Sequence, residues 1–258
     1  VACTTDTTTG VVAATPVRLG QPTTYTVSVQ GGGDAPADGQ AEVRADTGEH
    51  CIAAAASTID AAGAHFTCSI THATLGPATV TAEFSGSSTH TGSVSADFAQ
   101  LVMRFADVSV SAGDGTDDVR TGQEVQYLVE LRNAGPDDAP RSSVLVSVQP
   151  ALHVDDWSCI AVGTAVCPAA SGSGDIAEFA DLPAGSGLDF VIHGYLANDL
   201  PGAVVLRADA AVSAGAPEFV LDTDGSNDSA VDENAVDRIF EDGFDEDLFD
   251  DGFARGSR

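Results

Sequence analysis

Apolar and polar residues alternate with a period of two along much of this chain. Tyr25, Val27 and Val29 fall on one side of such a segment, and the same alternation recurs over 65–70 and 78–84. Because successive side chains of a β-strand point to opposite faces, this pattern predicts strands with one buried face. Helical periodicity is almost absent, so we expect an all-β protein.

The alternation stops and restarts in the middle of the chain. Gly-rich and Ser-rich stretches separate the strands of the first half, which is typical of turns. Further strands are predicted in the second half, at 106–111, 124–131, 144–148, 188–196 and 203–212. Many short strands with such turns indicate β-sandwiches, and the restart indicates two of them in tandem.

Four of the five cysteines form two local pairs, Cys51 with Cys68 and Cys159 with Cys167. Two local pairs predict one disulfide in each half and an oxidising compartment. Metal binding is the alternative, but Cys51 and Cys68 lack a second close pair or a nearby set of Cys and His residues at ligand spacing. Cys3 has three interpretations: a free or capped thiol, a disulfide between chains, or the end of a lipoprotein signal.

Charge narrows the classes of function. The chain has 39 acidic residues against 10 basic ones and a formal net charge of −29, and every base is arginine. Nucleic-acid binding is excluded because phosphate contacts need a basic surface. Without lysine, Schiff-base chemistry and Lys–Asn isopeptide bonds are excluded too. No apolar run approaches the roughly 20 residues of a membrane helix, so we expect no membrane span.

Two stretches resemble known bacterial surface modules. Residues of about 4–100 resemble a bacterial immunoglobulin-like repeat, through Gly20-Gln-Pro-Thr-Thr-Tyr-Thr-Val27 and Ala82-Glu-Phe-Ser-Gly-Ser-Ser-Thr-His90. Residues of about 105–236 resemble the DUF11-type repeat of surface proteins, through Gly122-Gln-Glu-Val-Gln-Tyr127, Asn133-Ala-Gly-Pro136 and Trp157-Ser-Cys159. The resemblance implies stalks, spacers or adhesion units with no shared active site.

We therefore expect two tandem immunoglobulin-like β-sandwiches and an acidic C-terminal tail. The predicted boundaries are 1–103, 104–236 and 237–258. Trp157 lies two residues before Cys159, and we expect it to pack over that disulfide; stacking on a ligand is the alternative.

The tail carries an internal repeat. Ile239-Phe-Glu-Asp-Gly-Phe244 recurs nine positions later as Leu248-Phe-Asp-Asp-Gly-Phe253. A run of charges is usually a solvated end, but regularly spaced aromatic residues are unusual there. Ile239, Phe240, Phe244, Phe249 and Phe253, together with Cys3, are therefore candidates for contacts between chains, by strand addition or by Phe docking.

A second acidic segment resembles a calcium loop. Asp222, Asp224, Ser226, Asp228 and Glu233 place oxygen atoms at positions 1, 3, 5, 7 and 12 of such a loop. Asn227 occupies the position that a calcium loop reserves for glycine, and no helices are predicted on either side. A polar turn between two strands is the alternative interpretation.

The sequence shows no catalytic motif. The six histidines are scattered singly, and no nucleophile elbow, zinc motif or phosphate loop occurs. We expect a non-enzymatic structural protein, extracellular or at the surface of a bacterium, without a cofactor unless calcium binds. Its expected partners are copies of itself, possibly in a filament. The alternative is an adhesin or glycan-binding stalk of a larger secreted protein that recognises a glycan or host surface.

Overall fold

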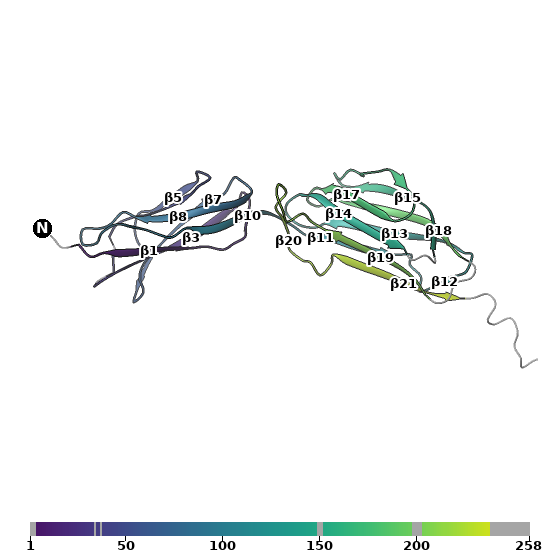
Figure 1. Ribbon diagram of the computed structural model, residues 1–258, viewed down its shortest axis with the longest axis horizontal. Helices are drawn as coiled ribbons and strands as arrows, with labels where there is room; N and C mark the ends of the chain where they lie inside the picture. The colour runs from purple at the N-terminus through teal and green to yellow at the C-terminus, as the bar shows by residue number, and fades with distance from the viewer. Residues whose placement is uncertain (1–3, 34, 37, 149–151, 198–202, 238–258) are drawn as a thin grey trace, which may run out of the picture. The chain divides into compact units, whose positions relative to one another are not determined.

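A computed structural model describes residues 4–33, 35–36, 38–148, 152–197 and 203–237 (Figure 1). Every regular element within these ranges is a β-strand, which confirms the all-β prediction. The chain forms two compact units. Unit 1 contains Val1–Ala106 together with Ser213–Leu221, and unit 2 contains Asp107–Val212 and the chain from Asp222 onward. The predicted contiguous boundaries do not include this return of the chain to unit 1.

Unit 1 is a sandwich of two sheets. The first sheet has the order β1-β3-β7-β6. Its strands are β1 (Thr7–Val12), β3 (Pro22–Gly31), β6 (Thr58–Asp60) and β7 (Gly63–Thr71). The second sheet has the order β2-β10-β8-β4-β5, with β9 beside β8 and β20 beside β10. Its strands are β2 (Val17–Arg18), β4 (Ala41–Ala45), β5 (His50–Ala53), β8 (Gly76–Phe84), β9 (Ser93–Val94), β10 (Phe98–Ala106) and β20 (Val220–Asp222).

The core of unit 1 follows the alternation that predicted its strands. Tyr25 and Val29 from β3, Phe66 from β7 and Val80 and Phe84 from β8 all have a relative exposure of 0%. The rings of Phe66 and Phe84 lie 5.7 Å apart and join the two sheets. The interior of the unit is filled by its own residues. Burying each of these large apolar side chains contributes roughly 1.5–3 kcal/mol to stability.

Unit 2 repeats the sandwich with two five-stranded sheets, in the orders β11-β13-β18-β15-β16 and β12-β21-β19-β14-β17. The first contains β11 (Val108–Gly113), β13 (Glu124–Asn133), β15 (Leu152–Val162), β16 (Ser171–Gly172) and β18 (Gly187–Leu196). The second contains β12 (Asp118–Arg120), β14 (Ala139–Val148), β17 (Ile176–Leu182), β19 (Val204–Ala211) and β21 (Ser229–Asp237). Its core includes Leu131, Leu182, Leu188, Phe190 and Leu206, each at 0% exposure.

The two units share a repeated turn that the sequence analysis did not identify as a repeat. Val17-Arg-Leu-Gly-Gln21 corresponds to Val119-Arg-Thr-Gly-Gln123. In both, the short strand before the turn pairs in parallel with the last long strand of its unit, β2 with β10 and β12 with β21. The turn glycines have φ angles of +71° and +72°, a left-handed conformation that glycine adopts without strain. Each turn leads into a strand whose tyrosine, Tyr25 or Tyr127, is buried.

The returning segment 213–221 completes the edge of the larger sheet in unit 1. The Arg104 backbone N–H donates to the Phe219 carbonyl at 2.9 Å, and the Arg104 guanidinium donates to the Glu218 carbonyl at 2.8 Å. The Phe219 ring approaches Gly76 so closely that a Cβ there would lie 3.0 Å from it. A stretch of chain that follows β19 of unit 2 in sequence is thus part of the fold of unit 1.

Candidate functional site

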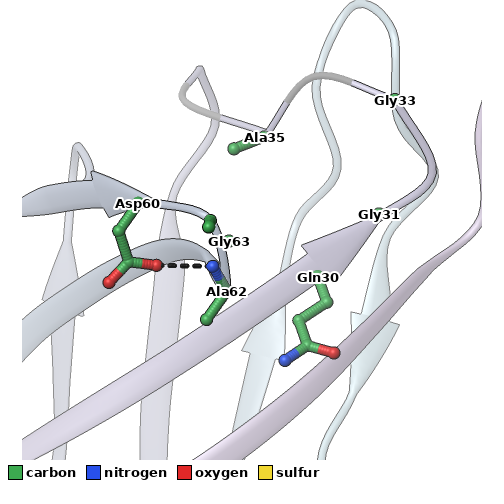
Figure 2. A pocket seen from close by; sticks show the side chains of 8 residues that line it. Gln30, Gly31, Gly33, Ala35, Asp60, Ala62 and Gly63 are labelled. Carbon is green, nitrogen blue, oxygen red and sulfur yellow. Dashed lines mark hydrogen bonds between the residues drawn. The ribbon is translucent and has the colours of Figure 1, made fainter.

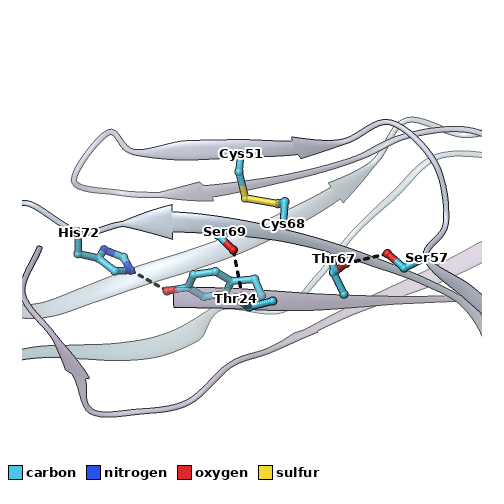
Figure 3. The surroundings of a disulfide bond; sticks show 8 residues. Thr24, Cys51, Ser57, Thr67, Cys68, Ser69 and His72 are labelled. Atoms are coloured by element: carbon cyan, nitrogen blue, oxygen red, sulfur yellow. Dashed lines mark hydrogen bonds between the residues drawn. A yellow bond between two sulfur atoms is a disulfide. The ribbon is translucent and has the colours of Figure 1, made fainter. Parts of the chain in front are cut away.

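The first expected disulfide joins the two sheets of unit 1. Cys51 on β5 and Cys68 on β7 are bonded, with their Cα atoms 5.9 Å apart (Figure 3). The strands belong to different sheets, so the bond holds the sandwich closed. A disulfide that closes a loop of this size contributes about 3 kcal/mol in the chain-entropy account.

The second disulfide, Cys159–Cys167, lies within unit 2 and is local. It ties the end of β15 to the loop that follows, across a sequence separation of 8. Trp157 is buried at 4% exposure, and its ring packs edge-on against Phe190 at 5.8 Å. The indole also covers Gly172 on the paired strand β16. Trp157 is therefore a core residue and does not present its ring for stacking on a ligand.

The expected calcium set is not assembled in the structure. Asp222 accepts hydrogen bonds from the backbone N–H groups of Val108 and Asp224, both at 3.1 Å. Asp224 accepts from the Ser226 backbone and hydroxyl, bonds that lower its pKa. Glu233 is an exposed residue of β21, opposite Val205.

The carboxylates of this segment therefore shape a polar turn. Among the described residues, no group of three or more His, Cys, Asp and Glu side chains is arranged to hold a metal ion. Asp228 nevertheless has a raised pKa, first because of burial and then because of the nearby charges of Asp222, Asp224 and Asp107.

A buried polar network lies at the end of unit 1 where β3 begins and β7 ends. The Tyr25 hydroxyl donates to Gln100 Oε1 at 3.0 Å. It also lies 2.7 Å from His72 Nε2, and Figure 3 shows this contact as the dashed line at His72. Burial, and then the charge of Glu49, raise the pKa of Tyr25 to about 12. Burial lowers the pKa of His72, against a smaller opposing effect of Glu49. Because the Tyr25 hydroxyl donates its proton to Gln100, His72 Nε2 carries the proton of the other bond and donates it to the Tyr25 oxygen.

Unit 2 has a corresponding network around its own tyrosine. The Tyr127 hydroxyl donates to Asn234 Oδ1 at 2.9 Å, and Asn234 Nδ2 donates to Asp114 and to the Thr116 carbonyl. Burial raises the pKa of Tyr127. Asp232 beside this network also has a raised pKa, because of burial and of the charge of Asp114. Both tyrosines thus anchor the repeated turn to the opposite sheet.

Three side chains on the outer face of unit 1 make contacts in the order of a hydrolase triad. The Ser28 hydroxyl lies 3.0 Å from His65 Nδ1, and His65 Nε2 lies 3.2 Å from Asp60 Oδ1. The sequence analysis did not group these residues, which come from β3, β7 and β6. The Asp60 side chain is 59% exposed, whereas a triad carboxylate is buried beside its imidazole. Cross-strand polar pairing on an open sheet face explains these contacts.

A polar hollow of about 310 Å³ lies next to Asp60. Figure 2 shows the Asp60 carboxylate accepting from the Ala62 backbone N–H, a bond of 2.7 Å. The hollow is lined by Gln30, Gly31, Gly33, Asp60, Ala62 and Gly63. Gly63 has a φ of +131°, and a Cβ at this position would lie 2.3 Å from the Val29 carbonyl oxygen. Only glycine therefore fits the turn that forms the floor of the hollow.

A second hollow, in unit 2, combines apolar side chains with a cation. We call it the Phe179 groove; it has a volume of about 570 Å³. Its walls include Arg141, Val166, Cys167, Pro168, Phe179 and Pro183. Phe179 is 63% exposed and Val166 is 74% exposed. The sequence analysis missed this groove, although Phe179 has a recognisable signal: it is out of phase with the buried Ile176, Ala180 and Leu182 of the same strand.

The Arg141 side chain is positioned by an irregularity in β14. The register of β14 against β17 shifts between Ala139 and Ser142, and Arg141 has a φ of +54°, which is uncommon for a residue other than glycine. Its backbone N–H donates to Asp181 Oδ1 at 2.9 Å, and its guanidinium carbon lies 5.7 Å from the Phe179 ring centre. Bulges of this kind redirect a side chain, here over an exposed aromatic ring.

Two candidates from the sequence lie outside the described residues: Cys3, and the tail residues Ile239, Phe240, Phe244, Phe249 and Phe253. Their role in contacts between chains stays a prediction. A search of the described residues for a helix long and apolar enough to cross a membrane finds none.

Comparison with known proteins does not assign the chain to a family. No protein-family model matches the chain, and no curated protein matches it. The resemblance to the DUF11-type repeat therefore stays a prediction. The solved structures similar to it include three all-β examples.

The CARDB domain of a Pyrococcus furiosus protein, solved with di-metal ions, is 15% identical, covers 53% of this chain and 93% of its own, and has a TM-score of 0.35. Fibronectin(III)-like modules of Clostridium thermocellum CbhA are 12% identical over 88% of this chain and 93% of theirs, with a TM-score of 0.30. The Staphylococcus aureus collagen adhesin is 10% identical over 92% of this chain and 98% of its own, with a TM-score of 0.27. At these values the likeness carries no function. Its own strands and sheets define the chain as an all-β protein with two sandwiches.

Proposed function

We propose that this chain is a non-enzymatic, extracellular structural subunit of a bacterial surface assembly, and that copies join through their termini into a filament. The observation that carries the proposal is that each unit is a filled sandwich that contains its own disulfide. Such bonds persist in oxidising compartments outside the cytosol. Two filled sandwiches in series make a spacer, and the repeated Phe motif that follows supplies the contact between copies.

Charge constrains how such copies can meet. A net charge of −29 makes copies repel one another, and salt screens this repulsion beyond about 8–10 Å at physiological ionic strength. Association therefore needs a specific contact that overcomes the repulsion. Assembly is expected to strengthen as NaCl is raised, which is opposite to the behaviour of a complex held by opposite charges.

The test is a pair of truncations in the full, oxidised protein. Removing residues from Ile239 onward deletes all the tail phenylalanines, whereas removing residues from Ala254 onward keeps all four. Light scattering and negative-stain imaging are expected to show assemblies for the full chain and the shorter truncation, and monomers for the longer one. Assemblies that persist without residues 239–258 would show that the tail does not join the copies.

A Cys3→Ser variant, with and without reductant, separates the role of the orphan thiol. Assembly that survives in this variant assigns the contact to the tail. Assembly that is lost only in this variant assigns it to a disulfide between chains.

A second candidate function, a glycan-binding adhesin stalk, is favoured by the hollow beside Asp60. Its carboxylate, the Gln30 amide and nearby backbone groups are hydrogen-bonding partners of the kind that bind sugar hydroxyls. A glycan screen with the monomeric 1–238 protein tests this. Binding that is weakened by Gln30→Ala, but not by Gln40→Ala, would support the adhesin.

Hydrolysis of an activated ester that is lost in Ser28→Ala would instead support an enzyme. Such turnover would contradict the non-enzymatic proposal.

A further inference from the structure

We propose that the Phe179 groove is the acceptor site for the acidic, Phe-containing tail of another copy of this chain. This inference rests on the proposed self-assembly and identifies the surface that the tail contacts. The groove is an open hollow in unit 2 with both an exposed aromatic ring and a guanidinium in its wall. The tail offers the complementary groups, because each repeat places a Phe directly before two acidic residues and another Phe after Gly.

The apolar part of the groove matches the phenylalanines of the tail. Phe179 and Val166 are 63% and 74% exposed, so both present apolar side chains at the groove. Pro168 and Pro183 extend this wall, and neither can donate a backbone hydrogen bond, so a peptide here is recognised chiefly through its side chains. Aromatic residues prefer edge-on or offset contacts with other rings, which Phe179 can provide. The disulfide at Cys167 fixes the loop that carries Val166 and Pro168.

The charged part of the groove matches the acidic residues of the tail. The chain has only 10 bases, and Arg141 is held at the groove by a bulge, by a bond to Asp181 and by the ring of Phe179. A guanidinium has five N–H donors in a planar fork that suits carboxylates. Each tail repeat has adjacent acids one or two residues after its first Phe. One repeat can therefore place a ring on Phe179 and a carboxylate on Arg141 at the same time.

Geometry directs the first tail repeat to another copy. The pairing of β21, β19, β14 and β17 places Phe179 two residues beyond the Ser229 end of β21, whereas the tail leaves from the Asp237 end. At about 3.4 Å per residue along the strands and 4.8 Å between them, the separation is roughly 37 Å. Fully extended chain from Asp237 reaches at most about 11 Å at Phe240 and about 25 Å at Phe244. These two rings cannot enter the groove of their own chain.

The Asp237 end of β21, after which the tail follows in sequence, and the groove therefore lie at opposite ends of one sheet. A contact between unlike surfaces of identical chains is heterologous, and it forms an open filament when the rotation does not close a ring. The second repeat, with Phe249 and Phe253, has enough chain to return to its own groove when nearly extended. Occupation by this repeat would cap a monomer, so the two repeats have different geometric options.

Peptide binding tests the groove independently of assembly. A fluorescent peptide of residues 238–254 is added to the monomeric 1–238 protein, and anisotropy is measured at 0.15 M and 0.5 M NaCl. We expect saturable binding that is lost when the four phenylalanines of the peptide are replaced by Ser, since its charge is unchanged. In the protein, Phe179→Ser and Arg141→Ser are each expected to weaken binding at least tenfold.

The matched control is Val231→Ser. Val231 is 54% exposed on the same sheet but is not part of the groove, so binding is expected to change less than twofold. Circular dichroism establishes that each variant is folded. Arg141→Lys retains the charge but not the fork, and we expect it to bind with intermediate affinity. Equal weakening by Val231→Ser and Phe179→Ser would overturn the inference, because it would indicate non-specific apolar contact.

The outcomes separate the groove from the proposed function. If removal of residues 239–258 abolishes assembly but Phe179→Ser in the full chain does not, the groove inference is wrong and tail-mediated assembly stands. If assembly survives the truncation while the peptide still binds in a Phe179-dependent way, the groove inference stands and tail-mediated assembly is wrong. Absence of peptide binding up to millimolar concentration overturns the groove inference in either case.

Discussion

At the scale of single residues, buried polar groups determine how this protein responds to pH. Tyr25 and Tyr127 each occupy the position that follows the repeated turn, and each donates its hydroxyl to a side chain of the opposite sheet. A buried hydroxyl without such a partner costs about 1–3 kcal/mol. His72 differs from the other two side chains of the Tyr25 network, because its Nδ1 atom is buried without a hydrogen-bond partner among the described residues.

His72 is expected to make unit 1 less stable in mild acid. Its pKa is lower in the folded state than the ordinary value of 6.5, so the unfolded chain binds the proton more tightly. The contribution of neutral His72 to the free energy of unfolding is fully present above pH 6.5. This contribution is lost as the pH falls through the lowered pKa of the folded state. Thermal unfolding followed by circular dichroism from pH 7.5 to 5 should show a larger fall in Tm for the wild type than for His72→Gln.

His50→Gln is the control for this prediction. His50 is exposed, so its replacement is expected to leave the pH dependence of the wild type unchanged. A slope that is the same in the wild type and in His72→Gln would show that the buried imidazole does not govern the acid response.

At the scale of the elements, the two disulfides connect different kinds of segment. Cys51–Cys68 joins strands of opposite sheets, whereas Cys159–Cys167 closes a local loop. The Phe179 groove depends on the second bond for one wall. The separate positions of the bonds predict that each one stabilises only the unit that contains it.

Replacing Cys51 and Cys68 together by Ser is expected to lower the free energy of unfolding of unit 1 by about 3 kcal/mol. The Cys159–Cys167 bond closes a shorter loop. Replacing both of its cysteines by Ser should therefore lower the free energy of unfolding of unit 2 by about 2.5 kcal/mol. Trp157 is the single tryptophan and lies in unit 2, so its fluorescence reports the second loss and circular dichroism reports both. A change in the Trp157 midpoint on removal of Cys51–Cys68 would contradict the independence of the two units.

The elements also show how far the sequence could be interpreted. The alternation at Tyr25, Val27 and Val29 predicts β3 and its buried face correctly, because this face of the strand packs into the core of the sandwich. The strand β15 was not predicted, since its register shifts between Val154 and Asp156 and this interrupts the period of two. The spacing of acids after Asp222 suggested a calcium loop, but a strand carries Glu233 away from the turn.

The Phe179 groove could not be predicted in the same way. It combines a bulge at Arg141, a strand edge at Phe179 and a disulfide-bonded loop at Val166, which are separated in the sequence and adjacent only after folding. The repeated turn could have been found, since Val-Arg-x-Gly-Gln occurs twice with the same spacing to a tyrosine. Its two copies lie in two stretches that resemble different families.

At the scale of the whole molecule, the main departure from a simple tandem arrangement is the segment 213–221. The chain passes between the units three times, after Ala106, after Val212 and after Leu221. The sequence analysis considered only the first crossing. The turn-like composition of segment 213–221 does not indicate that it pairs with β10, a strand more than a hundred positions earlier.

Gly76→Ala tests whether this segment is part of the fold of unit 1. Gly76 has a φ of +101°, and a Cβ here would press on the Phe219 ring at 3.0 Å. We expect a loss of about 1–2 kcal/mol from the strained backbone and faster hydrogen exchange at the Arg104 amide, which donates to Phe219.

Gly10→Ala is the control for this substitution, because a Cβ at Gly10 would meet no atom within 4 Å. It should leave exchange at Arg104 unchanged. Unaltered exchange in Gly76→Ala would show that β20 pairs with β10 independently of the Phe219–Gly76 contact.

The returning segment also sets the order in which the protein can be completed during its synthesis. The strands of unit 1 up to Ala106 emerge first, but the strand that finishes their larger sheet follows about 115 residues later. At roughly 5–20 residues per second, the newborn unit waits several seconds with the end of β10 unpaired. A chain of this design reaches its final form only when nearly all of unit 2 has left the ribosome.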